Sequence, residues 1–178
     1  DKVGVAGQRS RRLIELFRRF PPARFEELRD HAARTDAIPF IRAAAIDALA
    51  HAAGFHFADF FARATGDQSP EVAAAALRAL GLTGHAEAPT ILASAMANGD
   101  WDVRAAAADA AGRLGLAGLA APLSALMDDE AWTVRYAAAN ALRSFGQPGE
   151  RLLRDIAASE VSRSQRTASL ILAEGPAA

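Results

Sequence analysis

Residues 129–142 read Asp-Glu-Ala-Trp-Thr-Val-Arg-Tyr-Ala-Ala-Ala-Asn-Ala-Leu, an acidic turn followed by a Val-Arg pair and an Ala-rich segment. The same order recurs along the 178-residue chain. Its anchor residues are Ile41, Val72, Val103, Val134 and, in a degenerate copy, Gln165, so the interval is 31 residues every time. A fixed period of about 20–50 residues is typical of repeat proteins, in which each repeat is one supersecondary unit.

Each Ala-rich segment is predicted to be a helix, because Ala is the best helix former and apolar residues recur at the anchor and four, five and eight residues later. Signals for the helix ends also follow the period. Prolines that fit a first helical turn are Pro39 and Pro70. Residues that fit the N-cap position are Ser69, Asp100 and Ser162. Glycines expected to end the helices with a left-handed backbone are Gly84, Gly115 and Gly146.

Second amphipathic segments lie between these helices, at residues 57–64, 88–97, 119–127 and 151–158. The repeat is therefore a helical hairpin that must stack on its neighbours to bury both faces. Residues 9–20 read as an amphipathic helix and residues 24–34 as the first helix of the first hairpin. We predict an all-α fold, an α-α superhelix of about five hairpins with an N-terminal capping helix. It should form one domain over residues 9–178, after a flexible lead-in at 1–8.

The pattern of an Asp turn, Val-Arg, an Ala-rich helix with Leu and a closing Gly resembles the HEAT-like repeat, and more narrowly the short bacterial form named after phycobilisome lyases. Residues 129–146 and 98–115 carry it most fully, 67–84 lacks its Arg at Ala73, and 160–174 matches poorly. The resemblance implies a superhelix with the Ala-rich helices on the concave side. It says little about function, because such repeats serve many roles.

The resemblance also implies a structural ladder, in which turn carboxylates bond arginines and backbone N–H groups between repeats. Charge-assisted pairs of this kind would hold the register of the stack. The residues of these two columns are Asp36, Arg42, Asp67, Asn98, Arg104, Asp129, Arg135, Glu160 and Arg166. Because Ala73 replaces the second arginine, we expect the ladder to be interrupted there.

Positions two, six and nine after each anchor lie opposite the apolar stripe at 100° per residue, and we expect them to form the concave face. Candidate partner-binding residues there are Asp47, Arg78, Asp109, Tyr136, Asn140 and Arg143. Small residues expected beside them are Ala43, Ala50, Ala74, Gly81, Ala105 and Gly112, with Thr167 and Ile171 in the last repeat. The face is either a solvated helix surface or a groove for a partner.

Trp101 and Trp132 share one register position, which predicts either turn packing or an aromatic edge patch for a partner. The Arg-rich segment over residues 9–34 is either an end cap or a contact with an anionic membrane or with nucleic acid. The chain begins with Asp, which suggests a module of a larger protein, cytoplasmic and tethered to a membrane by segments outside this chain.

Composition narrows the function classes. The chain has no Cys, so neither disulfides nor thiolate chemistry is available. Its net charge of −1 disfavours a nucleic-acid partner. No His stands beside a Glu, and no phosphate loop or GxSxG motif occurs. We therefore predict a non-catalytic protein-interaction scaffold without cofactor or metal. The alternative is an enzyme or enzyme subunit of this fold, chromophore-lyase-like or DNA-glycosylase-like.

Overall fold

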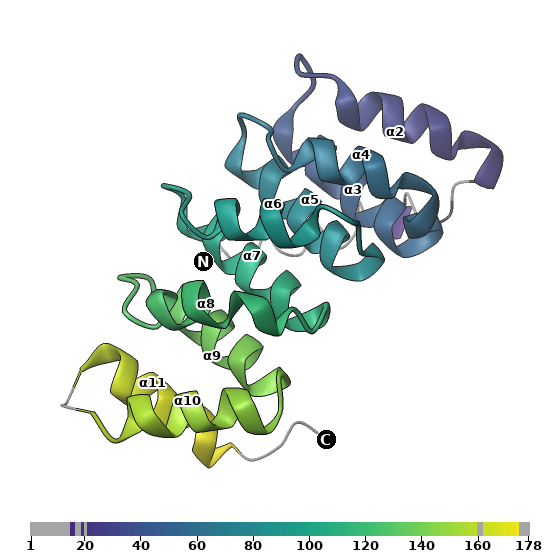
Figure 1. Cartoon of the computed structure of the whole chain (residues 1–178). Coiled ribbons are helices and arrows are strands. Elements are labelled where there is room, and N and C mark those ends of the chain that lie inside the picture. Colours follow the sequence, from purple (N-terminus) through teal and green to yellow (C-terminus); the bar gives the residue numbers. More distant parts are fainter. Residues whose placement is uncertain (1–14, 17–18, 20, 160–161, 175–178) are drawn as a thin grey trace. The chain divides into compact units, whose positions relative to one another are not determined.

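The computed structural model describes residues 15, 16, 19, 21–159 and 162–174, and every regular element in these ranges is a helix (Figure 1). The predicted all-α solenoid class is confirmed. The Ala-rich helices are α3 (Pro39–Ala53), α5 (Pro70–Thr83), α7 (Trp101–Arg113), α9 (Trp132–Ser144) and α11 (Arg163–Ala173). They begin at residues 39, 70, 101, 132 and 163, so the 31-residue period is confirmed. The predicted lead-in at 1–8 and most of the predicted helix over 9–20 lie outside the described residues.

The helices group into two compact units, unit 1 over residues 1–88 and unit 2 over residues 89–178. Unit 1 contains η1 (Pro22–Arg24), α2 (Phe25–Ala33), α3, η2 (Gly54–Phe57), α4 (Ala58–Ala64) and α5. Its helix α3 contacts both α2 and α5. Unit 2 contains most of α6 (Ala88–Ala95), then α7, η3 (Ala117–Leu119), α8 (Ala120–Leu126), α9, α10 (Gln147–Ala157) and α11. Its helix α9 contacts α7, α8, α10 and α11.

The helix ends follow the sequence signals in most cases. Pro39 and Pro70 stand in first turns, where a missing N–H costs nothing. The three terminating glycines, Gly84, Gly115 and Gly146, have φ of 71°, 64° and 68°. Asp100 and Ser162 cap their helices by accepting N–H hydrogen bonds, as predicted. Ser69 occupies the N-cap position but makes no capping bond with its side chain. Its N–H donates instead to Asp67 Oδ1 at 2.9 Å.

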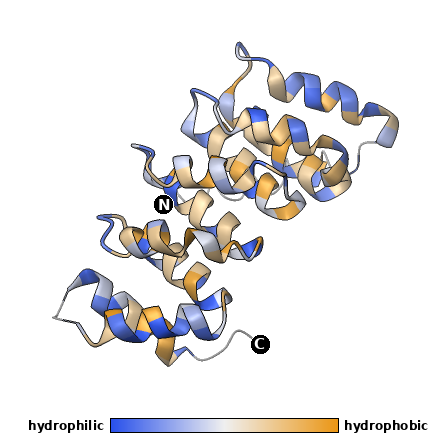
Figure 2. Ribbon diagram, in the orientation of Figure 1, coloured by the Kyte–Doolittle hydropathy of each residue, from blue (hydrophilic) through white to orange (hydrophobic). Residues whose placement is uncertain are grey.

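Each unit has its own apolar core. In unit 1 the aromatic residues Phe57, Phe60 and Phe61 lie in one cluster with Leu28 and Ile46, and α2 covers it with a largely hydrophilic outer surface (Figure 2). The buried core side chains of unit 2 include Leu123, Met127, Val134, Leu142, Leu153 and Ile171. Within the described residues, no helix combines the length and the apolar character needed to cross a bilayer.

Small residues bring helices of unit 2 close together. A Cβ on Gly112 of α7 would lie 2.8 Å from the Ala141 Cα of α9, and the Ser144 hydroxyl donates to the Gly112 carbonyl at 3.1 Å. The small residues expected on the concave face are mostly buried instead: Ala43, Ala50, Ala74, Gly81 and Ala105, together with Thr167 and Ile171. That part of the prediction is wrong, because a helix that is apolar nearly all round is buried nearly all round.

Candidate functional site

An arginine–aspartate pair ties the turn before α9 to helix α7. Arg104 donates through Nε to Asp129 Oδ2 at 2.7 Å and through Nη2 to Asp129 Oδ1 at 2.9 Å. Arg104 Nη1 also donates to the carbonyls of Asn98 and Gly99, at 2.8 and 3.0 Å. Asp129 Oδ1 accepts from the Ala131 N–H. The arginine hydrogen bond lowers the pKa of Asp129 against the opposing effect of burial, and the same bond raises the pKa of Arg104.

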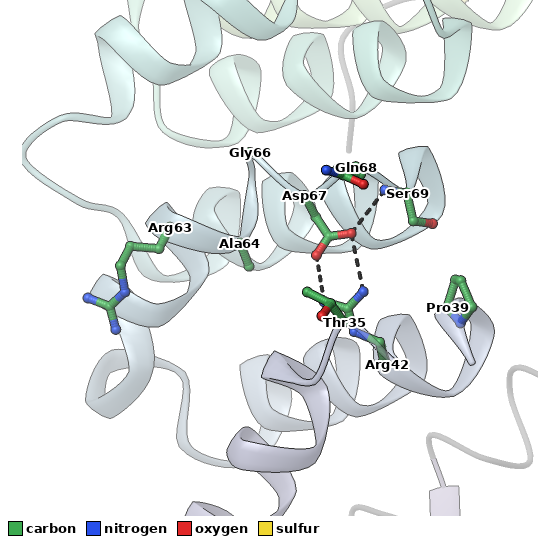
Figure 3. Close-up of a pocket in the computed structure, with 9 residues that line it drawn as sticks. All are labelled: Thr35, Pro39, Arg42, Arg63, Ala64, Gly66, Asp67, Gln68 and Ser69. Atoms are coloured by element: carbon green, nitrogen blue, oxygen red, sulfur yellow. Dashed lines mark hydrogen bonds and ion pairs between the residues drawn. The ribbon is translucent and has the colours of Figure 1, made fainter. Parts of the chain in front are cut away.

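The equivalent pair in unit 1 joins α3 to the turn before α5 (Figure 3). Arg42 is a buried residue, 4% exposed. Its guanidinium donates through Nη1 and Nη2 to the two Asp67 oxygens and through Nε to the Ala32 carbonyl. Burial opposes ionisation of Asp67, but the hydrogen bonds from Arg42 and the Ser69 N–H outweigh it and lower the pKa of Asp67. In both pairs the aspartate lies 25 residues after its arginine, hence in the following repeat.

The pair in unit 1 lines an open pocket of about 560 Å³ between the turns at residues 35–39 and 63–69. Figure 3 shows the carboxylate of Asp67 facing Arg42 and Ser69, while Arg63 extends away from this pair. The buried charges of the pocket are therefore satisfied within the protein.

Other members of the two ladder columns behave differently. Asp36 pairs with Arg34 on the exposed surface at 2.7 Å, and the Arg34 hydrogen bond lowers the pKa of Asp36. Asn98 Oδ1 accepts from the Asp100 N–H at 2.8 Å, which is the backbone half of a rung. Ala73 offers no side-chain donor. The two described aspartate–arginine rungs thus lie one in each unit.

The last two arginines of the ladder are Arg135 on α9 and Arg166 on α11. Arg135 Nη1 donates to the carbonyls of Asp129 and Glu130 at 2.8 and 2.9 Å. Arg135 Nε is buried and has no hydrogen-bond partner among the described residues. Glu160, the expected next carboxylate, lies outside the described residues, and Arg166 is exposed.

The residues predicted to line the concave face fall into two groups: Asp47, Arg78 and Asp109 on α3, α5 and α7, and Tyr136, Asn140 and Arg143 on α9. In unit 1, Arg78 Nη2 of α5 donates to Asp47 Oδ2 of α3 at 3.1 Å. In unit 2, Asp109 pairs with Arg113 one turn further along α7 at 2.7 Å. Each of these aspartates is therefore paired with an arginine of its own unit.

The other group forms one surface, which we call the α9 stripe: Trp132, Tyr136, Asn140 and Arg143. At 100° per residue these four positions span an arc of about 80°. The Trp132 and Tyr136 rings lie 5.7 Å apart between centroids, with exposed fractions of 47% and 38%. The Arg135 guanidinium carbon lies 5.5 Å from the Trp132 ring centroid. The Asn140 amide donates to the Tyr136 carbonyl at 3.0 Å and accepts from Arg143 Nη2 at 2.7 Å.

The α9 stripe contains residues of two sets that were predicted separately, the concave-face residues and the tryptophans of the edge patch. Trp101, 49% exposed, begins α7 as Trp132 begins α9, and the Arg104–Asp129 pair ties these helix starts together. The contact between the two rings could have been predicted from the sequence, because Trp132 and Tyr136 are four residues apart and such residues are neighbours on a helix. No sequence pattern pointed to Phe55, which is 82% exposed in unit 1.

The histidines form isolated surface contacts. His56 lies 3.1 Å from Glu26, and His85 lies 3.2 Å from Asp59. Over the ranges that the structure describes, no three His, Cys, Asp or Glu side chains gather in a way that could hold a metal ion.

Comparison with known proteins agrees with this architecture. A sequence model of HEAT repeats matches residues 57–143 and 90–173, and no curated protein matches the chain. Among solved structures, the chain is similar to an engineered protein, with 18% identity over 92% of this chain and 87% of the other and a TM-score of 0.60.

Two further structures are similar over most of their length. One is the designed armadillo repeat protein YIII(Dq.V1)4CPAF in complex with peptide (KR)4, with 15% identity, 92% and 90% coverage and a TM-score of 0.57. The other is smu.31 from Streptococcus mutans UA159, with 14% identity, 96% and 92% coverage and a TM-score of 0.52. At these identities the likeness concerns the fold.

Proposed function

The chain belongs to the HEAT repeat family, and from that premise we propose that it is a non-catalytic scaffold that binds a partner polypeptide through the α9 stripe. The exposed, mutually contacting rings of Trp132 and Tyr136 carry the proposal. Aromatic side chains of this kind supply most of the energy at protein interfaces, provided that neighbouring groups exclude water. Trp101, at the equivalent position of α7, is exposed to a similar degree.

The state of the polar side chains supports a binding role rather than a chemical one. The Arg42–Asp67 and Arg104–Asp129 pairs are satisfied within the fold. General acid–base catalysis needs a titrating group poised near neutral pH, whereas the pKa of each of these aspartates is lowered from an already acidic value. A similar designed repeat protein was solved with a peptide bound, which favours a polypeptide as the partner class.

Finer assignments belong to the same proposal. The 31-residue period with Val-Arg and a closing glycine supports the short bacterial phycobilisome-lyase type of HEAT repeat. We also propose that residues 9–178 form a single domain and that the protein is cytoplasmic. Its Arg-rich N-terminal segment would bring it close to a membrane.

Selection from a displayed random-peptide library tests the proposal. Peptides enriched on the wild-type chain should bind the double variant Trp132→Ala/Tyr136→Ala at least tenfold more weakly. Phe55→Ala is the matched control, because it removes an exposed aromatic ring from unit 1. Selected peptides that bind the double variant as well as the wild type would count against the α9 stripe as the site.

A further inference from the structure

The Asn140 side chain holds a defined orientation and retains hydrogen-bonding capacity. A primary amide has two N–H donors and two acceptor lone pairs. One donor is used by the Tyr136 carbonyl and one lone pair by Arg143 Nη2. The described residues provide no further partner for this amide. Asn140 therefore presents one N–H and one lone pair, which is the complement of the C=O and N–H of a single residue in an extended peptide.

The two rings next to Asn140 are suited to a cationic side chain. Arg135 already stands over Trp132 at 5.5 Å, so the ring accepts a guanidinium in this setting. Cation–π contacts at exposed sites contribute about 0.5–1 kcal/mol each. The half-exposed Tyr136 ring lies one turn closer to Asn140 and is free of that contact within the described chain.

The charge around the tryptophans of unit 2 has the matching sign. Carboxylates near the starts of α7 and α9 are Asp100, Asp102, Asp128, Asp129 and Glu130, and the guanidiniums there are Arg104 and Arg135. These are five formal negative charges against two positive ones, or against three when Arg143 at the far end of the α9 stripe is included. The helix N-termini add about half a positive charge each, which leaves the balance negative. A cationic segment is attracted to such a rim, and an acidic one is repelled.

The spacing along α9 sets the length of the occupant. Trp132 and Asn140 are eight residues apart, or about 12 Å at 1.5 Å per helical residue. An extended chain advances about 3.3 Å per residue, so roughly four peptide residues cover this distance. An octapeptide is long enough to reach the amide and both rings.

We propose that the α9 stripe binds a cationic peptide in extended conformation, with Asn140 hydrogen-bonded to its backbone and a basic side chain lying on Tyr136 and Trp132. This inference rests on the proposed function and names the chemistry of its partner. Asn140 selects an extended backbone because a helical peptide has its own backbone groups paired internally.

Three fluorescein-labelled octapeptides test the inference by anisotropy at low salt: (Gly-Arg)4, (Gly-Glu)4 and a (Gly-Arg)4 analogue with every backbone nitrogen methylated. We expect (Gly-Arg)4 to bind the wild-type chain, and (Gly-Glu)4 to bind at least tenfold more weakly. The methylated analogue keeps its charge but loses its N–H donors, so it should also bind about tenfold more weakly. Asn140→Ala should weaken (Gly-Arg)4 about tenfold and the methylated analogue less than twofold.

Gln147→Ala, which removes an exposed amide at the start of α10, should leave every affinity unchanged. Equal binding of the acidic peptide, or an equal effect of Asn140→Ala on both basic peptides, overturns the inference. If Asn140→Ala unfolds the chain, the ratio between the two basic peptides on the wild type still decides the backbone contact. Library peptides that need Tyr136 but are acidic or helical would sink this inference and leave the proposed function standing.

Discussion

Arg104→Ala should destabilise the chain far more than Arg113→Ala, which removes a more exposed arginine from the same helix α7. Arg104→Ala deletes two charge-assisted hydrogen bonds to Asp129 and two bonds to turn carbonyls. The Asp129 side chain is only 8% exposed. It would keep a single backbone donor, the Ala131 N–H.

The magnitude follows from this loss of compensation. Breaking a buried ion pair costs about 3–5 kcal/mol, since the remaining charge is left desolvated. The Arg104 side chain is 17% exposed, so water can partly replace it. We therefore expect a cost below this range, of about 2 kcal/mol. For a chain of this length, about 2–4 °C accompanies each kcal/mol, which gives a melting temperature lower by about 4–8 °C.

Arg113→Ala is the matched control. Arg113 also stands on α7 and also has a 2.7 Å contact with an aspartate, but its side chain and that of Asp109 are 53% and 46% exposed. Such a surface pair contributes about 0.3–0.5 kcal/mol, so the melting temperature should fall by less than about 2 °C. Circular dichroism melts of the three proteins at pH 7 compare them. An Arg104→Ala effect no larger than that of Arg113→Ala would refute the argument from burial.

Two further perturbations follow from the same geometry. The pKa values of Asp67 and Asp129 are lowered in the folded chain. Their contribution to the free energy of unfolding is therefore fully present above the unfolded value of about 3.9 and is lost as the pH falls through the folded value. In urea titrations, Asp129→Asn should be less stable than the wild type at pH 7 and 5, and the gap should narrow as the pH falls below the unfolded value; a constant gap contradicts this. Gly149→Ala would place a Cβ 1.7 Å from the Leu142 carbonyl oxygen, and we expect it to lower the melting temperature by at least about 5 °C. Gly118→Ala, whose Cβ meets nothing within 4 Å, should change it by less than about 2 °C.

The sequence could predict the helices because the repeat has no insertions. Every copy keeps its length, so one recognisable copy sets the start of the others, including the degenerate one at α11. The second helices were predicted less accurately. Residues 151–158 were predicted, whereas α10 begins at Gln147. Pro148 in its first turn was the missed signal, because proline favours that position.

Burial on the Ala-rich helices could not be predicted from periodicity. Ala is compatible with either face, so a helix with Ala at most positions gives no contrast between a core side and a solvent side. Ala74 and Ala105 are therefore buried although the projection placed them on the open face. The pairing of Arg42 with Asp67 was also beyond the sequence, which identifies two columns but not which copy of one meets which copy of the other.

The register position six residues after the anchor explains why the proposed site is local and does not repeat along the stack. It holds Asp47, Arg78, Asp109 and Asn140 in successive repeats. Asp47 and Arg78 neutralise each other in unit 1, and Asp109 is paired within α7. An ionised carboxylate can only accept hydrogen bonds, and a guanidinium can only donate them. The Asn140 amide is hydrogen-bonded to Tyr136 and Arg143, and it keeps one N–H donor and one acceptor lone pair beyond those two bonds. Among these four positions, only Asn140 therefore offers both a donor and an acceptor to a peptide backbone.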